Sequence, residues 1–221
     1  MARRALPATA STLTALTAIA TLTLTACGGG GDAKSDDIKG ADTGTATPTA
    51  SASSAVDAQR PDISVPKDLT LVFDFKKPSD SDEATALDDA SNFIRALKHS
   101  IAAQDPKDAA YQFYSTAGAA KYAESQIEAW VKGGWTPTGE DRYYDAVTSK
   151  ADGAKAVLVS FCRNQAKSYS KDIKTNQVNY TKESLDSYLK YRILMKPSAS
   201  SSGIWQAQQI EVEGKAKECR P

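Results

Sequence analysis

Apolar residues recur along this chain with two different periods. Between about residues 82 and 133 they recur every three or four positions, which is typical of amphipathic helices. From Trp135 onward they recur at about every second position, which is typical of strands. Helices followed by strands predict an α+β domain, in which the helices pack on one face of a curved antiparallel sheet.

Three helices are expected in the first half of this domain. Asp80 and Ser81 offer an N-cap for the first one. The pair Asp105-Pro106 stops that helix and starts a short second one. Gly133-Gly134 ends the third. The apolar face of the first helix comprises Ala86, Ala90, Phe93, Ile94, Leu97 and Ile101.

About four strands are expected in the second half, with polar loops over residues 164–183 and 196–203 between the later ones. Before the helices, "LTLVFDF" at residues 69–75 is either a short strand or an extended lead-in. The four strand-like segments are "RYYDAVTS" (142–149), "AKAVLVSFC" (154–162), "SYLKYRILM" (187–195) and "GIWQAQQIEV" (203–212).

The N-terminus has the three parts of a secretion signal. Arg3 and Arg4 supply positive charge, and residues 5–26 carry no charge. The sequence Leu-Thr-Ala-Cys at residues 24–27 resembles the bacterial lipobox, which implies cleavage before Cys27 and a diacylglyceryl thioether on its sulfur. Residues 1–26 are therefore interpreted as a lipoprotein signal peptide. The alternative is an ordinary secretory signal that happens to precede a cysteine.

Residues 27–66 are interpreted as the lipidated cysteine and a disordered linker rich in Gly, Ser, Thr and Ala. This segment contains no aromatic residue and cannot bury enough apolar surface to offset its ordering entropy. Residues 67–221 form the single folded domain. Two acyl chains on Cys27 give stable anchoring in the lipid bilayer, so the expected location is the extracytoplasmic face of the cell membrane.

The charge balance argues against nucleic acid as a partner. The whole chain has 27 basic and 27 acidic residues, and without Arg3 and Arg4 the basic count falls to 25. No basic block stands out, which argues against nucleic acid as a partner.

A series of landmarks in the second half resembles a known family. "TPTGEDRYYDAV" is followed by a cysteine that ends an apolar strand, then by "KSYSKD", a Tyr-rich strand, "GIW" and a final cysteine. In this order they resemble a group of actinobacterial lipoproteins and secreted proteins with an NTF2-like, or cystatin-like, cone domain. The resemblance spans about residues 82–219 and implies a fold far more than an activity. Where that family often carries an aspartate, this chain has Asn164.

Two cysteines remain in the exported domain once Cys27 is assigned to lipid. An isolated pair in an oxidising compartment favours a disulfide between Cys162 and Cys219. The alternative is two unpaired thiols.

The candidate site is a cavity between the sheet and the helices. Trp135, Tyr143, Tyr191 and Trp205 are candidates to line it, and ordinary core packing is the competing interpretation. His99 is the only histidine, so neither a metal site nor a cofactor is expected.

Two functions remain open. The first is a non-enzymatic binding or accessory domain that engages another envelope protein or a small apolar ligand. The second is a cone-fold enzyme of the isomerase or cyclase type, with Asp145 as the candidate catalytic carboxylate because it shares a strand face with Tyr143. A buried carboxylate beside tyrosines in a deep pocket would favour the enzyme, whereas a cavity filled by Trp and Tyr would favour the accessory domain.

Overall fold

The computed structural model describes residues 60–151 and 155–221, which lie within the compact unit Thr49–Pro221. The predicted signal peptide, Cys27 and most of the predicted linker lie outside the described residues. After one short strand, three helices precede the rest of the sheet, close to the predicted order. The elements are β1 (Leu69–Asp74), α2 (Ser81–Ala103), α3 (Ala109–Tyr114), α4 (Ala117–Gly133), β2 (Trp135–Lys150), β3 (Val157–Asp172), β4 (Val178–Asn179), β5 (Tyr188–Pro197) and β6 (Trp205–Gly214), with short 3-10 helices at Leu185–Ser187 and Lys217–Cys219.

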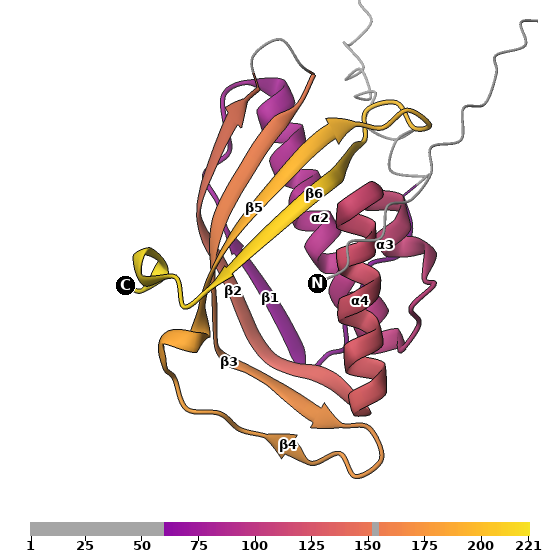
Figure 1. Cartoon of the computed structure of the whole chain (residues 1–221), viewed down its shortest axis with the longest axis vertical. Coiled ribbons are helices and arrows are strands. Elements are labelled where there is room, and N and C mark those ends of the chain that lie inside the picture. Colours follow the sequence, from indigo (N-terminus) through magenta and orange to yellow (C-terminus); the bar gives the residue numbers. More distant parts are fainter. Residues whose placement is uncertain (1–59, 152–154) are drawn as a thin grey trace, which may run out of the picture. The chain divides into compact units, whose positions relative to one another are not determined.

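The sheet is larger than predicted and is mixed. It has six strands in the order β1-β2-β3-β5-β6, with β4 paired to β3. β1 runs parallel to β2, whereas every other pair is antiparallel. A parallel pair needs a long crossover, and the three helices between β1 and β2 provide it. The fold class is as predicted, because the helices cover one face of a curved sheet in the manner of an NTF2-like cone (Figure 1).

The two longest strands bend together around the helices. β2 and β3 are 16 residues each, and both curve near their lower ends in Figure 1. The predicted loop after Cys162 is wrong over its first part, because residues 135–140 pair with residues 167–172 and extend β3 to Asp172. The bend passes through Gly139, whose φ is 91°. A Cβ there would lie 2.1 Å from the carbonyl oxygen of Lys167, so the close approach of the strands requires glycine.

The main core lies between the sheet and the helices. The predicted apolar face of α2 is buried there, including Phe93 and Ile94. Asp80 caps α2 by accepting hydrogen bonds from the backbone N–H groups of Asp82 and Glu83. Gly134 ends α4 with a φ of 69°. The helix boundaries therefore follow the capping signals in the sequence.

Residues 60–66 belong to the packed domain, although they fall in the segment expected to be linker. Arg60 Nη1 donates a hydrogen bond to Asp89 Oδ1 on α2 at 2.5 Å. Asp89 is fully buried and also accepts from the backbone N–H of Trp205 at 2.8 Å. Ile63 packs against the main core. The packed domain therefore includes Arg60. The buried carboxylate of Asp89 on α2 needs a cation, and Arg60 provides it.

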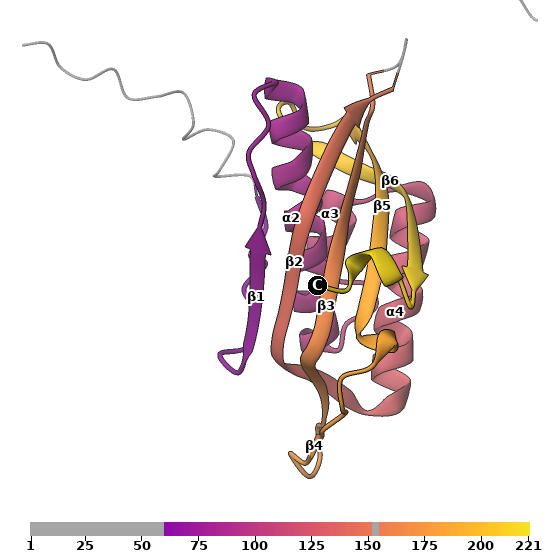
Figure 2. The ribbon, with the colours of Figure 1, turned by 90° about the vertical axis from the view of Figure 1, so that its left-hand side faces the viewer.

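Cys162 and Cys219 form the predicted disulfide, with their Cα atoms 5.3 Å apart. Cys162 lies inside β3, not at its end, and faces away from the helices because its neighbour Phe161 faces them. After β6 the N–H of Ala216 donates to the carbonyl of Tyr188 at 3.0 Å. The last 3-10 helix thereby lies against the outer face of the sheet (Figure 2). A small second core forms there from Cys162, Tyr188, Ala216 and Cys219.

We expect Arg60→Ala to lower the free energy of unfolding by about 2 kcal/mol, because it leaves the buried Asp89 carboxylate without its cation. Arg142→Ala is the matched control. Arg142 pairs with Asp74 at 2.7 Å, with the two side chains 53% and 62% exposed, and such a pair contributes less than about 1 kcal/mol. Urea-induced unfolding of both variants measures the difference. Equal losses would contradict a structural role for Arg60.

Loss of the disulfide should lower the free energy of unfolding by about 4 kcal/mol in the chain-entropy model, since the bridged cysteines are 57 residues apart. Cys162→Ser, Cys219→Ser and chemical reduction of the wild type should give similar losses in denaturant titrations. The double serine variant is the control, because a reductant should leave its stability unchanged. Rapid maleimide labelling of both thiols in the native, unreduced protein would rule out the bond.

Candidate functional site

Three charged residues form a buried cluster between α2 and the sheet. Lys98 Nζ on α2 lies 2.7 Å from Asp141 Oδ2 on β2. Arg163 on β3 donates from Nε to Asp141 Oδ1 at 2.8 Å, and its Nη2 lies 2.6 Å from the same oxygen. Asp141 is 0% exposed, and the side chains of Lys98 and Arg163 are 7% and 11% exposed. The cluster thus holds two cations and one carboxylate away from solvent.

The sequence positions of these residues explain why they face inward. Lys98 comes four residues after Ile94 and therefore lies within the apolar face of α2. Arg163 continues the two-residue alternation of buried apolar residues on β3. Asp141 comes two residues before the buried Tyr143 on β2, at a register shift in the β2–β3 pairing. None of these three residues was a predicted site residue, although each is a charged residue at a core-facing position of its helix or strand.

Burial and the neighbouring charges shift the pKa values of all three residues in the cluster. Burial acts to raise the pKa of Asp141, but Arg163 and Lys98 outweigh it and hold that pKa below its usual value. Burial lowers the pKa of Lys98, and the neighbouring Arg163 lowers it further, against the opposing effect of Asp141. Burial also acts to lower the pKa of Arg163, but Asp141 dominates and that pKa is well above its ordinary value. Asp141 is therefore a firmly ionised partner of two cations.

A cavity of about 230 Å³ lies next to the cluster. Lys98 and Arg163 line it, whereas Asp141 is not among the lining residues. The wall therefore presents the two cations, and their carboxylate lies behind them. The remaining lining residues are Ile94, Leu97, Ile101, Tyr122, Gln126, Trp130, Tyr143, Gln165, Leu189 and Tyr191.

Tyr143 lines this cavity and is fully buried. The side chain is 0% exposed, and its hydroxyl has no hydrogen-bond partner among the described residues. Burial, and then the nearby Asp141, raise the pKa of Tyr143 well above its ordinary value, so the hydroxyl keeps its proton. The ring is stacked on Phe73, with centroids 4.7 Å apart. Packing fixes the ring, and the hydroxyl remains available as a donor.

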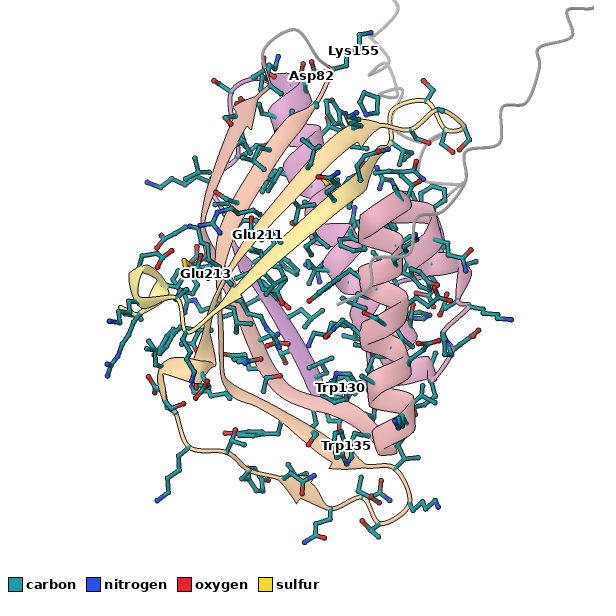
Figure 3. The ribbon with its side chains drawn as sticks, in the orientation of Figure 1. Asp82, Trp130, Trp135, Lys155, Glu211 and Glu213 are labelled. Carbon is teal, nitrogen blue, oxygen red and sulfur yellow. A yellow bond between two sulfur atoms is a disulfide. The ribbon has the colours of Figure 1, made fainter. Side chains whose placement is uncertain are left out.

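A wider groove of about 560 Å³ adjoins the cavity. The two share Trp130, Arg163 and Gln165 as lining residues. Trp135 lines the groove and is 42% exposed. Figure 3 shows Trp130 and Trp135 near the end of α4 and the start of β2. The groove and the cavity thus share part of their walls.

The four predicted aromatic residues occupy three different environments. Tyr143 and Tyr191 line the cavity. Trp205 is buried in the main core and does not line it. Trp135 lines only the outer groove. Two of the four candidates therefore lie at this cavity, and the other two do not.

The strand pattern predicts that Asp145 shares a face with Tyr143, and this prediction is wrong. The β2–β3 register shifts between Tyr144 and Val147, and Asp145 has a φ of 51° within this irregularity. The bulge turns Asp145 outward, so it is exposed and lines a surface pocket of about 740 Å³ beside the C-terminus. The carboxylate near the tyrosines is Asp141 instead.

The side chain of His99 contacts two neighbouring segments. Its Nδ1 lies 2.6 Å from the carbonyl oxygen of Ser64, and its Nε2 lies 3.5 Å from Asp108 Oδ2. Within residues 60–151 and 155–221, no group of His, Cys, Asp and Glu side chains is arranged to hold a metal ion. In the same described ranges, no helix combines the length and apolar character needed to cross a membrane.

Comparison with known proteins gives distant structural similarity only. No protein-family model and no curated protein matches the chain. Aln2 from a Streptomyces species is 14% identical, with a TM-score of 0.42, over 65% of this chain and 97% of Aln2. CagV, a VirB8 homolog from Helicobacter pylori, is 9% identical, with a TM-score of 0.38, over 58% of this chain and 97% of CagV. The intermembrane space region of the chloroplast protein ARC6 is 9% identical, with a TM-score of 0.34, over 57% of this chain and 94% of that region. These values are low, and the fold assignment rests on the architecture described above.

Because the cluster has two cations and one carboxylate, we expect substitution of the carboxylate to destabilise the protein more than substitution of Lys98. Asp141→Asn should lower the free energy of unfolding by about 3 kcal/mol, because it leaves two buried cations uncompensated. Lys98→Met should change it by less than about 1 kcal/mol, because a balanced Arg163–Asp141 pair remains. Urea titrations at neutral pH measure both values. If Lys98→Met is as damaging as Asp141→Asn, Lys98 is needed to compensate Asp141 and the cluster has no surplus cation.

Proposed function

We propose that this protein is a bacterial lipoprotein that presents a non-enzymatic binding domain outside the cytoplasmic membrane. Cys27 carries the lipid, and the segment up to residue 59 serves as the tether. The lipobox at residues 24–27 and the uncharged segment before it support the anchor. The sequence landmarks shared with actinobacterial lipoproteins of NTF2-like fold support the same assignment.

The observation that carries the binding function is the placement of Asp141 behind Lys98 and Arg163. A general acid or base must reach the substrate and needs a pKa near the working pH. Asp141 does not line the cavity, and its two cations lower its pKa. The other fully buried carboxylate of the described chain, Asp89, is held by Arg60 and the backbone of Trp205. Neither is suited to proton transfer, whereas an open cavity with fixed donors is suited to binding.

We infer two kinds of partner. The bilayer holds the protein through diacylglyceryl-Cys27, and the cavity and its groove face a ligand in the extracytoplasmic space. Another envelope protein is the alternative partner, with the groove beside Trp130 and Trp135 as its contact surface.

The anchor is tested by replacing Cys27. The full-length protein should incorporate labelled palmitate and sediment with membranes, whereas Cys27→Ser should do neither, because serine lacks the thiol that accepts the lipid. Ser51→Ala, in the same tether, is the control and should behave like the wild type. Palmitate labelling that survives Cys27→Ser would refute the lipoprotein assignment.

A further inference from the structure

The cavity wall carries hydrogen-bond donors and positive charge that the described protein does not fully use. Asp141 is the only ion-pair partner of Lys98 and of Arg163 in the described chain. An ammonium and a guanidinium together have more N–H donors than one carboxylate can accept. The long contact from Arg163 Nη1 to the hydroxyl of Tyr191, at 3.4 Å, uses little of the remainder. Tyr143 lines the same cavity, and its buried hydroxyl has no hydrogen-bond partner among the described residues.

The part of the wall that flanks Lys98 is apolar, and Gln126 and Gln165 add polar side chains elsewhere. Ile94, Leu97 and Ile101 come from one face of α2, and Leu189 comes from β5. Trp130 closes the side toward the groove. A ligand that satisfies both parts of the wall has one anionic end and one apolar end.

The volume limits the size of such a ligand. The cavity measures about 230 Å³, more than the roughly 150 Å³ that accommodates benzene in an engineered core. It is smaller than the pockets of about 300–1,000 Å³ that hold drug-sized molecules. A molecule of roughly ten non-hydrogen atoms fits this range.

We propose that this cavity binds a small organic carboxylate with an apolar, ring-sized body. The carboxylate accepts hydrogen bonds from Lys98 and Arg163, and the hydroxyl of Tyr143 donates to the same end. The apolar body lies against the α2 residues and Trp130. This inference rests on the proposed binding function and specifies its ligand.

A single negative charge matches the cluster better than water or a small inorganic ion. Water can accept hydrogen bonds from the donors, but it brings no charge to balance the second cation. A chloride ion balances the charge but leaves most of the cavity and its apolar wall unfilled. The carboxylate balances the charge and also stabilises the protonated form of Lys98, whose pKa burial lowers.

Calorimetric titration tests this proposal on full-length protein purified from membranes in detergent, with empty micelles as the blank. The probes are benzoate, phenylacetate and cyclohexanecarboxylate, each compared with its neutral amide. At least one acid should bind about tenfold more tightly than its amide, because charge-assisted hydrogen bonds are lost in the amide. An excess of chloride should weaken acid binding only slightly.

Two variants assign the binding to the cavity. Lys98→Met should weaken acid binding about tenfold and remove most of the preference over the amide. Tyr143→Phe should weaken it about threefold while keeping that preference, because it removes a neutral donor. Lys121→Met, at an exposed position on α4, is the matched control and should bind like the wild type.

The outcomes separate this inference from the proposed function. Equal binding of acids and amides, or no binding of either, would overturn the carboxylate site. An acid preference that survives Lys98→Met would place the anion elsewhere and would also overturn it. None of these results alters the palmitate labelling of Cys27, which tests the anchor independently.

Discussion

The bend in β2 and β3 shapes the space in which the buried charge cluster and the cavity lie. Gly139 allows the two strands to approach closely, and the register shift between Glu140 and Arg142 follows directly after it. The curved sheet wraps around α2 and α4 (Figure 1) and encloses more space than the apolar side chains fill. Asp141 lies at the same irregularity, so the feature that shapes the cavity also places its buried charge. A flat sheet would pack against α2 and leave no room for the cluster or the cavity.

The two fully buried carboxylates among the described residues, Asp89 and Asp141, have different surroundings. Asp89 accepts from Arg60, from Asn92 and from the backbone of Trp205, which ties the segment before β1 to α2 and to the start of β6. Its donors come from several elements, and it is sealed between them. Asp141 faces two cations whose other sides border a cavity. The contacts of Asp89 hold three segments together. The contacts of Asp141 leave two cations at the wall of the cavity, where we propose that a ligand binds.

Much of the fold could be read from the sequence because its signals are local. Asp80 and Gly134 mark helix ends, the two periods separate helices from strands, and an isolated cysteine pair in a chain expected to be exported indicates a disulfide. The parallel pairing of β1 and the extension of β3 could not be predicted, since they depend on partners distant in sequence. The prediction of Asp145 as a site residue was wrong for a related reason. Strict alternation predicted that Asp145 faces inward, but a bulge reverses it, whereas Lys98, Asp141 and Arg163 kept to the core-facing positions that their spacing implies.

The placement of the disulfide explains how a domain of this size tolerates an imperfect interior. The side chains around the cavity of about 230 Å³ have fewer packing contacts than those of a filled core. The Cys162–Cys219 bridge contributes about 4 kcal/mol in the chain-entropy model. The bridge lies on the outer face of the sheet, in a small core separate from the main one (Figure 2). Stabilisation and the candidate site thus occupy opposite faces, and the bridge can offset the cost of the cavity without filling it.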